Sequence, residues 1–146
     1  MRLPYNVLVI PYMKRDDEFR YCLFKRKDSG HWQFIAGGGE EEDSNILETV
    51  KRESNEEAGL SSENKYMKLE SFSTIPAKHF GFVWGEDTLV IPEHVYAVSA
   101  KEKIKTSSEH QEFIWLSYEE AISILEYDSN KNALWELDYK LKNNIK

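Results

Sequence analysis

The sequence predicts an α/β fold in which a mixed β-sheet is covered by helices on both faces. Strand-like runs of apolar, β-branched and aromatic residues lie both before and after one strongly marked helix, and two further helical segments follow the last strand. No repeat, low-complexity tract or linker interrupts this order, and 146 residues fit one ordinary domain. We therefore expect a single domain over residues 1–146.

The first third of the chain contains three predicted strands. Apolar runs at 6–13 and 19–25 flank the polar segment 14–18, which predicts two strands joined by a turn. A third strand covers 32–35 and is followed by the glycines 37–39, which alone are typical of a flexible turn. Because they stand between a strand and a helix, these glycines can also offer backbone carbonyls to a metal ion.

The segment 44–58 is the best-marked helix. Ser44 is a suitable N-cap residue, and Gly59 is a suitable C-terminal end. One face between them carries small and apolar residues at helical spacing, namely Leu47, Val50, Ser54 and Ala58.

Three more strands are expected after this helix. They cover 66–75, 89–100 and 112–116. Pro92 lacks a backbone N–H, so the middle strand is expected to be an edge or bulged strand.

The chain closes with two expected helices. Ser117-Tyr118-Glu119-Glu120 is a capping box, and it opens a helix that ends near Glu126. Asp128 or Ser129 caps the last helix, whose buried face is expected to carry Ala133, Leu134, Leu137 and Leu141.

Composition excludes several classes of protein. The longest apolar run, 7–10, is far too short to span a bilayer, so we expect no membrane partner and a cytoplasmic location. A net charge of −7 is opposite to that of a protein that binds a nucleic-acid scaffold. The single cysteine, Cys22, lies in an apolar stretch and is expected to be a buried, inert thiol.

Acidic residues are concentrated between 40 and 57. This segment holds eight acids and two basic residues, so it accounts for −6 of the net charge of −7. At about 100° per residue, Glu53, Glu56 and Glu57 fall within an arc of roughly 100° on the predicted helix. Like charges at this spacing repel unless a cation binds among them, although a solvated acidic face is the alternative. Carboxylate ligands favour Mg²⁺, with Mn²⁺ as a substitute, whereas no cysteine or histidine is spaced for zinc.

The stretch from Gly38 to Leu60 resembles the Nudix box. The core of that pattern, R-E-U-x-E-E-x-G-U with U an apolar residue, is matched over residues 52–60 except at Ser54. Two further departures are Ser44 in place of a glutamate and Ala36 in place of a proline. P-loop chemistry is excluded, because the motif G-x-x-x-x-G-K-[ST] is absent.

The resemblance implies a Nudix-type α/β/α sandwich that hydrolyses a diphosphate linkage in a nucleotide-like small molecule. It implies that Glu53 and Glu57 are the main metal ligands and that Glu56 is a further or water-mediated ligand. Arg52 would orient these carboxylates. A backbone carbonyl of Gly37 or Gly38 would complete the metal shell.

Similarity to the family extends beyond the box. Residues 109–116 resemble the E-H-x-x-[YF]-x-W-L segment of bacterial members that act on dATP or dihydroneopterin triphosphate, and 128–137 resemble the same group. This implies cleavage of a nucleoside or pterin triphosphate to the monophosphate and pyrophosphate. It also implies that Glu109 is a metal ligand or general base, whereas without the resemblance Glu109 is an exposed loop residue.

Two other functions stay open. Pro76 lies sixteen residues beyond Leu60, as in the ADP-ribose pyrophosphatase subgroup, so a nucleoside diphosphate sugar is an alternative substrate. A nucleotide-binding module without catalysis is the other alternative. The sequence also leaves open whether the protein is a monomer or a homodimer.

Several residues are candidates for substrate binding. Arg26 alternates with its lysine neighbours on a predicted strand and can reach a phosphate, although a surface salt bridge is an equal alternative. Gly38 is expected to contact the substrate beside the metal. The aromatic rings that can stack on a purine or pterin, or simply pack in the core or a loop, are those of Trp32, His79, Phe80 and Trp84.

Overall fold

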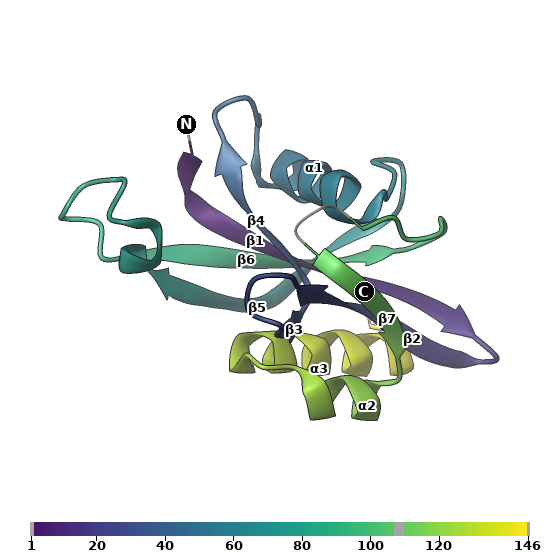
Figure 1. Cartoon of the computed structure of the whole chain (residues 1–146). Helices are drawn as coiled ribbons and strands as arrows, with labels where there is room; N and C mark the ends of the chain where they lie inside the picture. Colours follow the sequence, from purple (N-terminus) through teal and green to yellow (C-terminus); the bar gives the residue numbers. More distant parts are fainter. Residues whose placement is uncertain (1, 107–109, 146) are drawn as a thin grey trace.

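The computed structural model describes residues 2–106 and 110–145, which form a mixed sheet with helices on both faces (Figure 1). The strands are β1 (Arg2–Arg15), β2 (Glu18–Arg26), β3 (Trp32–Gln33), β4 (Ile35–Glu40), β5 (Tyr66–Pro76), β6 (Val90–Ser99) and β7 (His110–Leu116). The helices are α1 (Ile46–Ala58), α2 (Tyr118–Ile124) and α3 (Asp128–Lys142), with a short 3₁₀ helix η1 (Ala77–Phe80). The fold class expected from the sequence is confirmed.

Strand β1 is central to the sheet. The strand order is β3-β2-β1-β6-β5, while β4 pairs with β1 and β7 pairs with β2. Along one edge β1 pairs with β4 and then, from Tyr12 onward, with β2. Along its other edge it pairs with β6 in parallel, whereas the other ladders are antiparallel.

The two faces of β1 belong to different cores. Val7 and Val9 pack in the core that contains residues of α1, whereas Leu8 and Ile10 pack with residues of α2 and α3. Accordingly α1 covers one face of the sheet, and α2 and α3 cover the other (Figure 1). A strand that is buried on both faces needs an unbroken apolar run, which explains the sequence at 7–10.

The start of α1 differs from the expected one. The N-cap residue is Asn45, whose side chain accepts a hydrogen bond of 2.9 Å from the Glu48 N–H, so the expected cap at Ser44 is wrong. Asparagine and serine both serve as caps, and here the helix begins one residue later than the sequence predicts. Gly59 ends α1 in the left-handed conformation, as expected.

The last two helices agree in part with expectation. Ser117 and Glu120 form the predicted capping box of α2, which ends at Ile124. The N-cap residue of α3 is Tyr127, which makes no capping hydrogen bond with its side chain. The expected cap at Asp128 or Ser129 is therefore wrong.

Two expectations about strands need correction. The glycines 37–39 lie inside β4 and not in a turn. Pro92 lies in an interior strand, because β6 has β1 on one side and β5 on the other, so the edge alternative is wrong. The β5–β6 ladder does contain an irregularity, but it lies between Lys68 and Phe72 and not at Pro92. The pairing with β1 begins at Glu93, so the missing N–H of Pro92 costs the β1–β6 ladder no hydrogen bond.

Cys22 is fully buried in the core on the α1 side, and burial raises the pKa of its thiol, which agrees with an inert structural cysteine.

Within 2–106 and 110–145, no helix combines the length and the apolar character that a membrane span requires.

Candidate active site

The glycines of β4 let helix α1 approach the sheet closely. A Cβ atom at Gly37 would overlap the carboxylate of Glu53, and a Cβ atom at Gly39 would overlap the ring of Tyr5. On the opposite face of β4, a Cβ atom at Gly38 would overlap the guanidinium of Arg2. The three glycines are therefore required for close packing of side chains against a strand.

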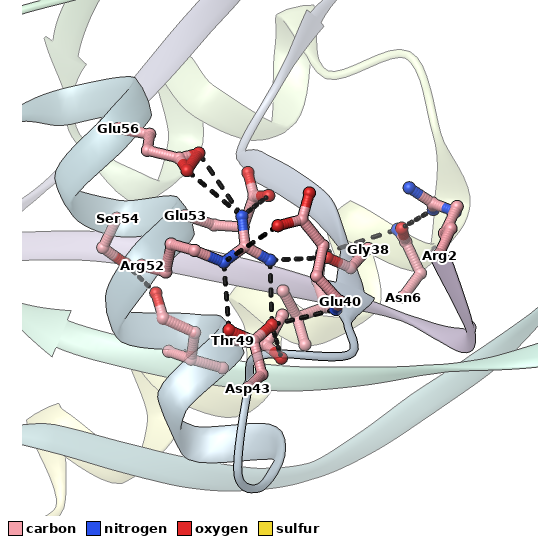
Figure 2. A network of polar contacts seen from close by, with 12 residues as sticks. Arg2, Asn6, Gly38, Glu40, Asp43, Thr49, Arg52, Glu53, Ser54 and Glu56 are labelled. Carbon is pink, nitrogen blue, oxygen red and sulfur yellow. Dashed lines mark hydrogen bonds and ion pairs between the residues drawn. The ribbon is translucent and has the colours of Figure 1, made fainter.

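Arg52 is the centre of a polar network between α1 and the β4–α1 loop (Figure 2). Its Nε and Nη2 atoms donate to the two carboxylate oxygens of Asp43, at 3.1 and 2.9 Å. Nη2 also donates to the carbonyl of Gly38 at 2.8 Å, and Nη1 donates to Glu53 at 2.9 Å and to Glu56 at 3.2 Å. Arg52 thus contacts two of the three glutamates that it is expected to orient.

Asp43 is the strongest partner of Arg52. The hydrogen bonds from Arg52, followed by one from Thr49, lower the pKa of the Asp43 carboxyl to about 2. In return, Asp43 raises the pKa of the Arg52 guanidinium more than any other group does. Asp43 lies beside Ser44, the position at which the family pattern has a glutamate. The carboxylate of Asp43 thus lies in the β4–α1 loop, one residue before the position at which the family has a glutamate.

The three glutamates of the box lie in different environments. The side chain of Glu53 is 13% exposed and that of Glu56 is 54% exposed, and both contact the same atom of Arg52. Glu57 is buried. Over the described parts of the chain, no three Asp, Glu, His or Cys side chains are gathered closely enough to form a ready metal cluster. Glu109 lies outside the described residues.

The residues around Glu53 nevertheless fit a hard divalent cation. Glu53, Glu40 and Gly37 line one cleft, and together they offer two carboxylates and a backbone carbonyl, which are oxygen donors. The carbonyl of Gly38 already accepts from Arg52, which leaves Gly37 as the better candidate of the two glycines. An ion held by few carboxylates keeps free positions for water and for phosphate oxygens.

The cleft has two adjoining lobes. The first lobe, of about 740 Å³, is lined by Glu53, Arg2 and Arg26 among others. The second lobe, of about 370 Å³, is lined by polar groups such as Glu93 and by apolar residues such as Ile75. Both lobes share the residues Asn6, Gln33, Ala36, His79 and Tyr127, so they form one continuous depression.

The structure brings together only some of the expected substrate-binding residues. Arg26, Gly38, His79 and Phe80 line the first lobe, and Arg26 also forms two hydrogen bonds with Asp28, at 3.1 and 3.0 Å. The two tryptophans are not among the lining residues. Trp32 packs against the core under α2 and α3, and Trp84 donates a 2.7 Å hydrogen bond from its indole to the carbonyl of Arg2.

Sequence reasoning missed a chain of three polar side chains that links the two lobes. Arg2 Nη2 donates to Asn6 Oδ1 at 2.7 Å, and Asn6 Nδ2 donates to Glu93 Oε2 at 2.6 Å. The Arg2 guanidinium also lies 4.4 Å from the centre of the Phe80 ring. Burial lowers the pKa of Arg2 and raises that of Glu93, the latter against hydrogen bonds from Asn6 and Ser73.

One signal for Glu93 was present in the sequence. Burial alternates along β6 from Val90 to Ala97, where the buried positions are Ile91, Glu93, Val95 and Ala97. An acidic residue at a position whose alternate neighbours are apolar indicates a buried carboxyl with a specific role. Arg2 offers no comparable signal, because its partners come from distant parts of the chain.

Comparison with known proteins agrees with this geometry. The family model described as "NUDIX domain" matches residues 2–137. A dihydroneopterin triphosphate diphosphatase from Haemophilus influenzae is 29% identical over 143 residues, which cover 94% of this chain and 89% of that protein.

Solved structures show the same fold. A Listeria monocytogenes chain assigned to the NUDIX hydrolases superposes with a TM-score of 0.88 at 44% identity, covering 98% of this chain and 97% of its own. The Escherichia coli dihydroneopterin triphosphate pyrophosphohydrolase has a TM-score of 0.77 at 19% identity, over 95% and 97% of the two chains.

Nucleotide-like ligands occur on this fold. The NUDIX domain of Shewanella oneidensis NrtR, solved with ADP-ribose, superposes with a TM-score of 0.70 at 12% identity, over 100% of this chain and 90% of that chain. Nudix hydrolases generally use divalent metal ions. The family match and the diphosphatase relative support the expected class of enzyme, a hydrolase that acts on phosphorus-containing anhydrides. With a family model that matches almost its whole length, the chain belongs to the NUDIX domain family.

Proposed function

We propose that the protein is a Mg²⁺-dependent pyrophosphohydrolase, with Mn²⁺ as a substitute, that cleaves a nucleoside or pterin triphosphate to the monophosphate and pyrophosphate. The observation that carries the proposal is the shared first lobe, in which Glu53 and Glu40 lie with Arg2 and Arg26. Acids that can hold a cation and bases that can hold phosphate oxygens face one space. The second lobe then receives the ring of the substrate.

We assign metal binding, carboxylate orientation and phosphate binding to different residues of the first lobe and of α1. Glu53 would hold the metal from the first lobe beside Glu40, with Glu56 and Glu57 as the further ligands that the Nudix box implies. Arg52 orients Glu53 and Glu56 through its Nη1 atom. Arg2 and Arg26 bind phosphate oxygens at the other side of the lobe. When bound, Mg²⁺ neutralises charge on the phosphates and lowers the pKa of a water that attacks phosphorus.

Product analysis tests this function. The protein is incubated with nucleoside triphosphates, dihydroneopterin triphosphate and ADP-ribose in Mg²⁺, and monophosphate, pyrophosphate and orthophosphate are separated. We expect pyrophosphate from a triphosphate, loss of activity in excess EDTA, and recovery with Mg²⁺ or Mn²⁺, because the acids and the phosphates otherwise repel. Full turnover in EDTA, or orthophosphate as the product, would contradict the proposal.

A matched pair of variants localises the activity to the first lobe. Glu53→Gln removes the carboxylate that faces Gly37 and is expected to lower kcat by on the order of 10² or more. Glu48→Gln makes the same change at an exposed position on the same helix and should leave kcat near that of the wild type.

A second candidate substrate is ADP-ribose. Pro76 lines the second lobe, and an NrtR domain with the same fold binds ADP-ribose. Faster cleavage of ADP-ribose than of any triphosphate would favour this candidate. Binding without release of any product would favour a non-catalytic module instead.

A further inference from the structure

Glu93 places a buried carboxyl in the wall of the second lobe. The residue is 6% exposed, and it is the first residue of β6 that pairs with β1. Its Oε2 atom accepts a 2.6 Å hydrogen bond from Asn6, and Ser73 Oγ lies 3.5 Å from Oε1. Asn6 is itself fixed by Arg2, so the Asn6 amide presents its N–H group to Glu93.

This carboxyl has acceptor capacity that its protein neighbours do not use. A carboxylate can accept about four hydrogen bonds. Across the residues the structure describes, Glu93 has one short hydrogen bond and one at the limit of length, and no lysine, arginine or histidine forms an ion pair with it. Burial of a carboxyl with so few donors is costly unless a ligand supplies more.

The surroundings of Glu93 suit a flat heterocycle. Leu8, Ala36, Ile75 and Pro76 give the second lobe apolar walls that can pack against ring faces. The side-chain oxygen of Asn130 already accepts from the Phe34 N–H at 3.0 Å. Among these wall residues, Glu93 is therefore the carboxyl placed to select the edge of a ring.

We propose that Glu93 recognises a heterocycle that carries a 2-amino group beside a ring N–H, as guanine and pterins do. This inference rests on the proposed function and names the class of ring it acts on. Two adjacent N–H donors match the two oxygens of a carboxylate in a bidentate pair. The equivalent edge of adenine carries a C–H and a lone pair, so it offers no donor and repels the carboxylate. Hypoxanthine keeps the ring N–H but lacks the amino group.

Guanosine and inosine triphosphates provide the sharpest test, because they differ only in the 2-amino group. We expect the wild-type kcat/KM to be about 10- to 100-fold higher for GTP than for ITP, the range for loss of one hydrogen bond to a charged group, and lower again for ATP. Comparing GTP with dihydroneopterin triphosphate then shows whether the preferred ring is a purine or a pterin. Equal kcat/KM for GTP and ITP would overturn the proposal.

Variants assign the preference to the residue. Glu93→Gln keeps the shape but replaces one acceptor by a donor, so the GTP/ITP ratio should fall toward 1. Glu70→Gln, on the neighbouring strand with a side chain that is 89% exposed, should keep the wild-type ratio. A Glu93→Gln variant with an unchanged ratio contradicts the proposal. If this variant does not fold, Glu93→Asp, which draws the carboxylate back, serves in its place with the same expected loss.

Binding without metal separates this inference from the proposed reaction. Calorimetry with guanosine and inosine 5′-monophosphates, which need no hydrolysis, should show tighter binding of the guanosine compound to the wild type. If no triphosphate is cleaved but this difference is found and is lost in Glu93→Gln, the proposed function fails and the ring selection stands. If triphosphates are cleaved but neither monophosphate is preferred, the ring selection fails alone.

Discussion

Asp43 stabilises the candidate site through contacts that no single motif describes. Its carboxylate accepts hydrogen bonds from the Glu40 N–H at 3.0 Å, from the Thr49 hydroxyl at 2.7 Å, and from two atoms of Arg52. The side chain is only 6% exposed, so water competes weakly for these contacts. The β4–α1 loop and the arginine of the box are thereby held to one another.

The low pKa of Asp43 predicts a pH-dependent contribution to stability. The folded pKa of about 2 lies below the unfolded value near 3.9, so the contribution is complete above about pH 5 and is lost as pH falls toward 2. Asp43→Asn should lower the free energy of unfolding by about 1–2 kcal/mol at pH 7, and the difference from wild type should shrink below pH 4. Urea titrations at pH 7, 5, 4 and 3 measure this.

The control for this prediction is Glu42→Gln, which changes an exposed acid in the same loop. That variant should differ little from the wild type at each pH. If Asp43→Asn were equally destabilising at pH 7 and pH 3, shape and not charge would explain its effect.

Glu109 is the expected acid outside the box, and its role stays a prediction. As a metal ligand or general base it should be sensitive to loss of charge, so Glu109→Gln is expected to lower kcat by on the order of 10² or more with little change in melting temperature. Glu112→Gln is the control, since Glu112 lies on β7 with an exposed side chain 3.7 Å from Lys25. A Glu109→Gln variant that keeps more than about half of the wild-type kcat returns Glu109 to the exposed-loop interpretation.

At the scale of the elements, the packing of helix α1 against strand β4 depends on glycine. Gly37→Ala would place a methyl group where the Glu53 carboxylate lies, so either helix α1 or the Glu53 side chain must shift. We expect a loss of about 1–3 kcal/mol in the free energy of unfolding together with weaker Mg²⁺ binding, measured by urea titration and calorimetry.

Gly39→Ala provides the matched comparison on the same strand and face. The added methyl group would meet Tyr5 and not Glu53, so stability should fall by a similar amount while Mg²⁺ affinity is retained. Equal loss of Mg²⁺ affinity in both variants would mean that Gly37 acts only through the packing of β4.

At the scale of the whole molecule, the sequence predicts what depends on local order. Helix α1 with its terminal glycine, the capping box of α2 and the acids at 53, 56 and 57 all follow from short spacings. The chain Arg2–Asn6–Glu93 does not, because Asn6 and Glu93 are 87 positions apart and meet only through the parallel pairing of β1 with β6. Likewise, the glycines 37–39 indicate a turn when only the sequence is considered. Their place in β4 becomes clear only from the close packing of Glu53 of α1 against Gly37.

The same parallel pairing has a consequence for synthesis of the chain. A ribosome delivers β1 first, and β1 can pair with β2 and β4 as soon as those strands follow, because both are close in sequence. Its opposite edge accepts β6 only after residues 93–99 have been made. Until then a nascent chain carries an open strand edge with a fully apolar run, which is a template for pairing with other chains. The strand that organises the finished sheet is thus also the segment that most needs protection while the protein is incomplete.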